Sequence, residues 1–421
     1  MSGKEFTQKM LLQTSVTGEF EEQSRTTEKN INERFFSWMV SRKFAEQSDL
    51  SDDLNFAANE KDDDVIFNHS DRTSKYQRVL LDVEKDGEKK RRLEKRAHAD
   101  AIKTASLLIN KEASKQIQTD LSDNARNFRS LLRLSSAGND LFEVLYAKVA
   151  TLSRVASIIE HNFPQFSRFI IDTVNSSAFC KSLGRTPKNV RDIRAALGFI
   201  GLDGLRVLLP IMFFKEKVRF HNESLPLMAN KYWSYSLRLS NTARYICDCH
   251  GIGQPDRALL PGVMRNLGSL AAYHQFEHSW MTAKQNIMVK LRESEKDEDR
   301  SIYYACKDVQ PSGKSLIQIM PSLSDKITRH VVEQCDWQQL RREKNALLED
   351  LEDIDMSKRS PMGIALKQAR LSAQFNILSR HKLVKKDEIK PILWRSRLTQ
   401  KQMVSIHNSA LHKVDLKALI G

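Results

Sequence analysis

Apolar residues recur at helical spacing along most of this chain. The stretch 141–163, LFEVLYAKVATLSRVASIIEHNF, predicts one amphipathic helix. Its apolar side carries Leu145, Val149, Leu152, Val155, Ile158 and Ile159. Pro164 suits the first turn of the next helix, because proline lacks the amide hydrogen that this turn leaves unpaired. That second helix is expected to point Phe166, Phe169, Ile170 and Val174 inward.

The helical spacing continues toward the C-terminal end. Residues 189–209 predict two helices around a turn at 199–204, and residues 258–270 predict a mostly apolar helical segment with one polar step. The acidic stretch 349–355 is expected to link two later helices. Those later helices are predicted at 322–334, 337–351, 361–378, 387–394 and 399–411. Because the 421 residues include only 15 glycines and 10 prolines, helix breakers are few and we predict an all-α fold.

The first 138 residues differ in character from the rest. Residues 1–75 are predicted to be polar and partly disordered, with one short aromatic helix around 35–40, FFSWMV. Residues 76–138 predict a charged helical extension, and a break at 135–140 marks a domain boundary. The main helical domain is expected to cover 139–415. The aromatic helix is expected to dock on it; the alternative is a segment that binds a partner or touches a membrane.

The chain is strongly basic, with a formal net charge of +14. Six of the eight residues at 89–96, KKRRLEKR, are basic, and an acidic counterpart lies upstream at 52–64. Such a run is typical of a solvated helix; nucleic acid or an acidic membrane surface is the alternative partner.

Other features predict a cytoplasmic protein. No run of about 18 apolar residues predicts a transmembrane segment, and MSGKEFTQKMLLQTS has no apolar core of the kind found in secretory signals. The five cysteines are odd in number and widely spread, which favours free thiols in a reducing compartment over a disulfide framework.

Four motifs occur in a fixed order: VNSSAF at 174–179, IRAALGFIGL at 193–202, LRVLLP at 205–210 and GVMRNLG at 262–268. Together they resemble the HDOD domain, an HD-related output domain of bacterial signalling proteins. The resemblance is clearest over 141–273. It implies a bundle of HD-type helices preceded by a helical N-terminal extension.

The resemblance also implies a metal site that has lost its ligands. In HD hydrolases the last motif carries a His and an Asp side by side; here Arg265 and Asn266 stand in those positions. Tyr235 occupies the place of a further ligand, and Gln368 is aligned with a later family histidine. Arginine offers only donors and is always charged, so it is unsuited to bind a cation. We therefore expect no metal and no cofactor.

Five further residues are candidates for a site. Asn175 and Ser176 are expected to join helix ends, or alternatively to bind a ligand. Gly268 is expected to let a neighbouring helix approach closely. His274 and His278, one helical turn apart, are expected to be packing or surface histidines; the alternative is a relocated metal site.

The function expected from this sequence is a non-catalytic signalling or regulatory module that acts through contacts with a protein partner in a signalling pathway. An apolar groove left by the lost metal site, or the N-terminal helices, would offer the contact surface. One alternative is a metal-dependent phosphohydrolase with a rearranged site. Another is a basic protein that binds nucleic acid or a membrane surface.

Overall fold

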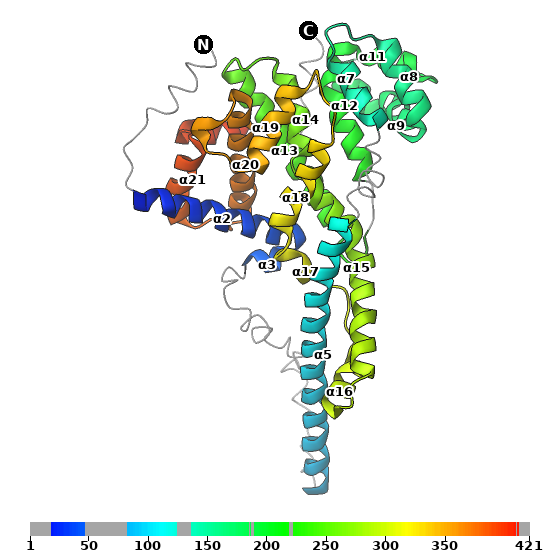
Figure 1. Cartoon of the computed structure of the whole chain (residues 1–421), viewed down its shortest axis with the longest axis vertical. Coiled ribbons are helices and arrows are strands. Elements are labelled where there is room, and N and C mark those ends of the chain that lie inside the picture. Colours follow the sequence, from blue (N-terminus) through cyan, green and yellow to red (C-terminus); the bar gives the residue numbers. More distant parts are fainter. Residues whose placement is uncertain are drawn as a thin grey trace, which may run out of the picture.

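The computed structural model describes residues 18–46, 82–123, 136–184, 186, 189–218, 222–409 and 411. Over these residues the fold is all-α, as predicted, with helices arranged in a body from which one long rod projects (Figure 1). The N-terminal helices are α2 (Gly18–Val40), α3 (Arg42–Glu46) and α5 (Asp82–Asp123). Among the described residues no single helix is long and apolar enough to cross a membrane. The helices at 193–200 and 202–217 reach the necessary length and apolar composition only when they are taken together, and they are bent by 112° relative to each other.

A lobe of shorter helices lies at one end of the body (Figure 1). It contains α7 (Ser136–Tyr146), α8 (Leu152–Asn162), α9 (Pro164–Asn175), α10 (Ser177–Ser182), α11 (Ile193–Ile200) and α12 (Leu202–Lys217). As predicted, Pro164 opens α9, which buries Phe166, Ile170 and Val174.

Two predictions for this lobe were wrong. Residues 141–163 form two helices, because the chain turns at 147–151 and Thr151 caps α8 by accepting a hydrogen bond from the Arg154 amide. Val149 therefore lies in the turn, 79% exposed. The second error is the break expected at 135–140. Residues 136–140 are helical, because they form the start of α7.

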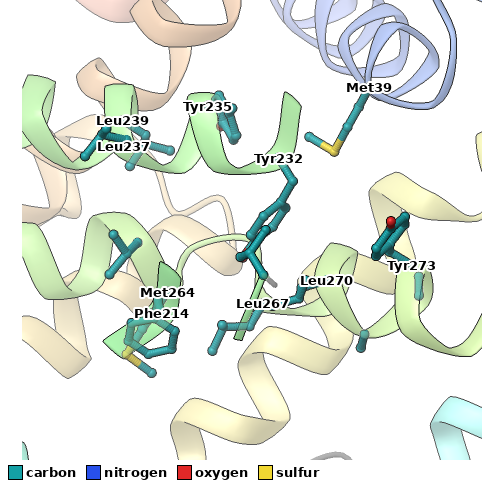
Figure 2. Packing of buried hydrophobic residues seen from close by; sticks show 14 of the residues in the cluster. Met39, Phe214, Tyr232, Tyr235, Leu237, Leu239, Met264, Leu267, Leu270 and Tyr273 are labelled. Atoms are coloured by element: carbon teal, nitrogen blue, oxygen red, sulfur yellow. The ribbon is translucent and has the colours of Figure 1, made fainter. Parts of the chain in front are cut away.

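The centre of the body is built by α13 (Met228–Cys249), α14 (Leu259–Met264), α15 (Leu267–Arg292) and α20 (Pro361–Arg380). Figure 2 shows Tyr232 of α13 among Leu267 and Leu270 of α15, with Met39 of α2 directed toward the same cluster. The remaining helices surround this centre: α16 (Asp297–Ala305), α17 (Lys314–Ile317), α18 (Met320–Glu333), α19 (Arg341–Leu351), α21 (Ile389–Ser396) and α22 (Gln400–Asn408). All five cysteines are free thiols.

The rod is formed by α5 packed along α15 (Figure 1). Its buried stripe repeats every fourth residue, with three alanines and three larger aliphatic residues: Ala101, Ala105, Ile109, Ala113, Ile117 and Leu121. Residues four apart lie on one face of a helix, so the stripe packs as a unit against α15. The earlier turns of α5 extend past the end of the stripe, and the basic run 89–96 is exposed there, as predicted. The acidic counterpart at 52–64 lies outside the described residues.

Helix α2 is much longer than the short aromatic helix that the sequence predicted. It begins at Gly18 and runs across the body beneath α20 and α21 (Figure 1). The aromatic segment is its last part, which is buried as expected for a docking helix. The earlier turns were missed because the face they bury includes polar residues, among them Glu28, 8% exposed. A polar buried face has no hydrophobic periodicity to detect.

Candidate functional site

Arg265 and Asn266 lie at a bend where α14 ends and α15 begins, so the predicted single helical segment 258–270 is broken in two. Glycines on either side of the bend permit close packing. A Cβ on Gly262 would come within 2.8 Å of Ser240 Cβ, and a Cβ on Gly268 within 2.7 Å of Ser324 Cα. The bend is thus fixed between α13 and α18, which buries both polar side chains to 3% exposure.

Arg265 is paired with two carboxylates. Its Nε donates to Asp350 of α19, and its Nη1 donates to Asp325 of α18 at 2.6 Å. Asp350 is fully buried and also accepts from Arg359 Nη1 at 3.1 Å and from Arg370 Nε at 3.0 Å. Burial by itself raises the pKa of Asp350, but Arg370, Arg265 and Arg359 together hold that pKa far below its usual range.

Glu28 of α2 forms a second anionic centre beside the first. Its oxygens accept from Arg370 Nη2 at 3.0 Å and from Arg395 Nε at 2.7 Å, and Lys367 Nζ lies 3.4 Å away. Burial raises the pKa of Glu28, and the three cations outweigh this effect and lower the pKa to about 2. Arg370 contacts both Glu28 and Asp350, so one guanidinium links the N-terminal helix to the bend at Arg265.

These groups line a pocket of about 360 Å³. Its wall consists of Arg25, Glu28, Lys29, Asn32, Arg265, Asp325, Asp350, Asp353, Asp355, Arg370 and Arg395. Every one of these side chains is polar or charged, and both signs are present. The sequence-based expectation of an apolar groove at this place was therefore wrong, because the position around Arg265 is filled by ion pairs that are stable only where each charge has a partner.

The three positions that the resemblance assigned to lost ligands come together. Tyr235 of α13 is fully buried, and its ring centre lies 4.4 Å from that of Phe35 on α2. Burial raises the pKa of Tyr235 to about 12, while Asn266 and Arg265 act in the opposite direction. Gln368 of α20 is fully buried as well. This part of the site offers a phenol, amides and a guanidinium.

The other candidates lie elsewhere. Asn175 Nδ2 donates to the Val190 carbonyl at 2.8 Å and its Oδ1 accepts from the Val190 amide at 2.9 Å, while Ser176 caps α10. Both therefore join chain segments, as expected. His274 is half-buried and burial lowers its pKa, whereas His278 is exposed. Among the described residues no group of three or more His, Cys, Asp or Glu is arranged to hold a metal ion.

Sequence reasoning missed Asp350, Arg359, Arg370 and Glu28 as site residues. The stretch 349–355 was expected to be a linker, yet Asp350 belongs to the last turn of α19. One signal was present: Asp350 shares the buried face of α19 with Ala346 and Leu347, at helical spacing. A carboxylate on an apolar stripe indicates a buried partner, although the sequence does not reveal which one.

Residues 131–309 match the family model of the HDOD domain. This chain carries an HDOD domain. Comparison with curated proteins and with solved structures gave no match. The HDOD domain is a signalling-related, HD-like module, and the match includes the bend at Arg265 and Asn266. The matched range does not include α2, α19 or α20. The carboxylates of Glu28 and Asp350 therefore come from parts of the chain that precede and follow the HDOD domain.

Proposed function

We propose that this protein is a non-catalytic HDOD-type regulatory module that acts through contacts with a protein partner. The observation that carries the proposal is the pairing of Arg265 with Asp350 and Asp325. Two carboxylates lie beside Arg265, the position that the HD resemblance assigns to a lost ligand, and the Arg265 guanidinium engages both. A cation entering there would have to displace that guanidinium from a site in which it is almost fully buried.

The rim of the charged pocket is the contact surface that the geometry favours. Lys29 and Asp355 lie at this rim with side chains 76% and 60% exposed, and Arg25 approaches Asp355 at 4.0 Å. Exposed charges of both signs suit a partner segment that also carries both signs, because complementary charges speed association and reject wrong partners. The rim includes α2 and the segment that follows α19, so the contact would join two parts of the chain that lie on either side of the HDOD match.

A capture experiment from the native host tests the contact surface. Lys29→Glu and Asp355→Lys, combined in one variant, should lose a partner that the parent retains at moderate salt. The matched control carries the same two charge changes at exposed positions of the rod, Lys111→Glu and Asp297→Lys. Equal capture by the rim variant and the control would contradict the assignment of the rim.

The alternative is a metal-dependent phosphohydrolase, which a turnover assay tests directly. We expect the parent protein to be inert toward phosphomonoesters, phosphodiesters and nucleotides, with or without added manganese. Turnover above blank that is lost in His274→Ala or His278→Ala would overturn the non-catalytic proposal and indicate a site on α15.

A second candidate function rests on the exposed basic run of α5. Lys89, Lys90 and Arg91 project from a part of the helix that packs against no other described element. Binding of nucleic acid or anionic vesicles with a steep salt dependence, lost when the run 89–96 is neutralised, would favour this function. We expect instead that neutralisation alters solubility and leaves partner capture unchanged.

A further inference from the structure

Arg238 of α13 is buried, and none of the described residues supplies it with a counter-ion. It is 3% exposed, its Nη1 makes no hydrogen bond, and within the described part of the chain no carboxylate forms an ion pair with it. The three helices around Arg238 contain almost no acidic residues. Neither α20 nor α22 has an Asp or Glu, and α13 has only Asp248, at its far end. Burying an unpaired cation is costly, so such a group indicates an absent partner of opposite charge.

The neighbours of Arg238 are further hydrogen-bond donors. Arg380 of α20 donates from Nη2 to the carbonyl oxygen of His407 at 3.3 Å. His407 of α22 donates from Nδ1 to Asn376 Oδ1 at 2.9 Å, because an amide oxygen can only accept. This bond orients the Asn376 amide, and its Nδ2 is buried with no acceptor. The cluster therefore combines two guanidiniums with one unused amide N–H group, which His407 holds in position.

The electrostatics agree with this geometry. Burial and the nearby Arg380 lower the pKa of Arg238 to about 10. Burial, Arg380 and Arg238 lower the pKa of His407. Burial and a neighbouring guanidinium thus both disfavour the charged forms of Arg238 and His407, which is the reverse of the charged pocket, where every cation lies against a carboxylate.

We propose that Arg238, Asn376 and Arg380 form a binding site for a phosphate group, with His407 as the residue that positions the Asn376 amide. A phosphate offers several acceptor oxygens in a compact tetrahedron, which suits a cluster of donors contributed by α13 and α20, and guanidiniums bind it in bidentate geometry. The site lies between α13, α20 and α22 and shares no residue with the wall of the charged pocket. Its ligand is free phosphate or the phosphate of a small phosphomonoester.

Calorimetric titration at constant ionic strength tests the site and distinguishes the two sources. Inorganic phosphate and glycerol 3-phosphate are the probes, with chloride as the reference anion. We expect saturable binding of one phosphate group per chain and a rise of the thermal unfolding midpoint with phosphate concentration. Tighter binding of inorganic phosphate indicates the free ion, and tighter binding of glycerol 3-phosphate indicates a phosphomonoester.

Two variants and one control complete the test. Arg380→Gln changes an exposed side chain and should weaken phosphate binding roughly tenfold, since one charge-assisted hydrogen bond is lost. Arg238→Met should abolish binding yet unfold at the same or a higher temperature than the parent without phosphate, because it removes an unpaired buried charge. The control Arg342→Gln, at an exposed position of α19, should bind as the parent does.

Three results would overturn the proposal. They are an absence of saturable binding to either probe, equal binding by Arg380→Gln and the parent, and a clearly lower unfolding temperature of Arg238→Met in phosphate-free buffer. The last result would mean that Arg238 already has a stabilising partner in the protein.

Discussion

Arg265 and Asp350 form a buried ion pair although 85 positions separate them in the chain. Arg265 belongs to the HDOD domain and Asp350 lies beyond its matched end. The pair thus joins Arg265 to a residue from a different part of the sequence, and three predictions follow from its surroundings and one from the adjacent glycine.

Asp350→Asn should strongly destabilise the protein. The amide cannot neutralise Arg265, Arg359 and Arg370, which would remain buried with too little negative charge. Removing one partner of a buried ion pair typically costs about 3–5 kcal/mol. Urea unfolding measures the change, and Asp355→Asn, at a side chain 60% exposed, is the control with an expected effect within about 0.5 kcal/mol. Equal midpoints for Asp350→Asn and the parent would mean that the network contributes nothing to stability.

Glu28 should make folding sensitive to acid. Its pKa falls from an ordinary 4.5 to about 2 in the folded protein, so the unfolded chain binds a proton more readily between these values. The stabilisation from Glu28 is therefore complete above about pH 4.5 and is lost as the pH falls toward 2, and it amounts to about 3 kcal/mol.

Unfolding free energies of the parent and Glu28→Gln across this pH range test the prediction. The gap between the two proteins should be widest near neutral pH and close as the pH approaches 2. A gap that stays constant with pH would indicate that the variant acts through packing alone.

Gly268 should be intolerant of any side chain. A Cβ there would meet the backbone of Ser324, which has no freedom to move away inside the packed α15–α18 contact. Gly268→Leu is expected to cost roughly 1–3 kcal/mol or more. The matched control is Gly198→Ala in α11, where a Cβ would meet nothing within 4 Å and helix propensity should add about 0.5–1 kcal/mol. If Gly268→Leu were as stable as the parent in urea, the close approach would not exist in solution.

Restoring the lost ligands should not restore a metal site. We expect the purified parent to contain no stoichiometric zinc, iron or manganese, and Asn266→Asp alone to add a carboxylate beside Arg265, with which it would pair. The double variant Arg265→His, Asn266→Asp still has Tyr235 in the further position and lacks partners that orient ligands. Metal analysis after dialysis and phosphoesterase assays measure the outcome. About one bound metal ion per chain in the parent would revive the hydrolase alternative.

Much of the fold could be predicted from local pattern. The helix opened by Pro164 and the helix at 361–378 follow directly from apolar residues that repeat every three to four positions. The HDOD resemblance depended on short motifs within one continuous stretch, and the family match over 131–309 confirms it. The assignment of Tyr235, Arg265 and Asn266 to lost ligand positions stays a prediction.

The charged pocket could not be predicted in the same way. An ion pair between residues far apart in the chain leaves no periodic signal, and a buried Glu28 looks in sequence like any solvated glutamate. The same holds for Arg238, because the absence of a counter-ion among the described residues around it is a property of three helices together.

The sequence by itself determined that this chain is helical, where most helices lie and that its centre carries an HDOD domain, because helix periodicity and short motifs are encoded by neighbouring residues. Only the tertiary structure decided that α2 docks through Glu28, that Asp350 pairs with Arg265, and that the pocket beside Arg265 is charged instead of apolar. Those outcomes depend on which charges meet after the helices have packed, and the free energy of a buried charge is set by partners that are distant in the chain.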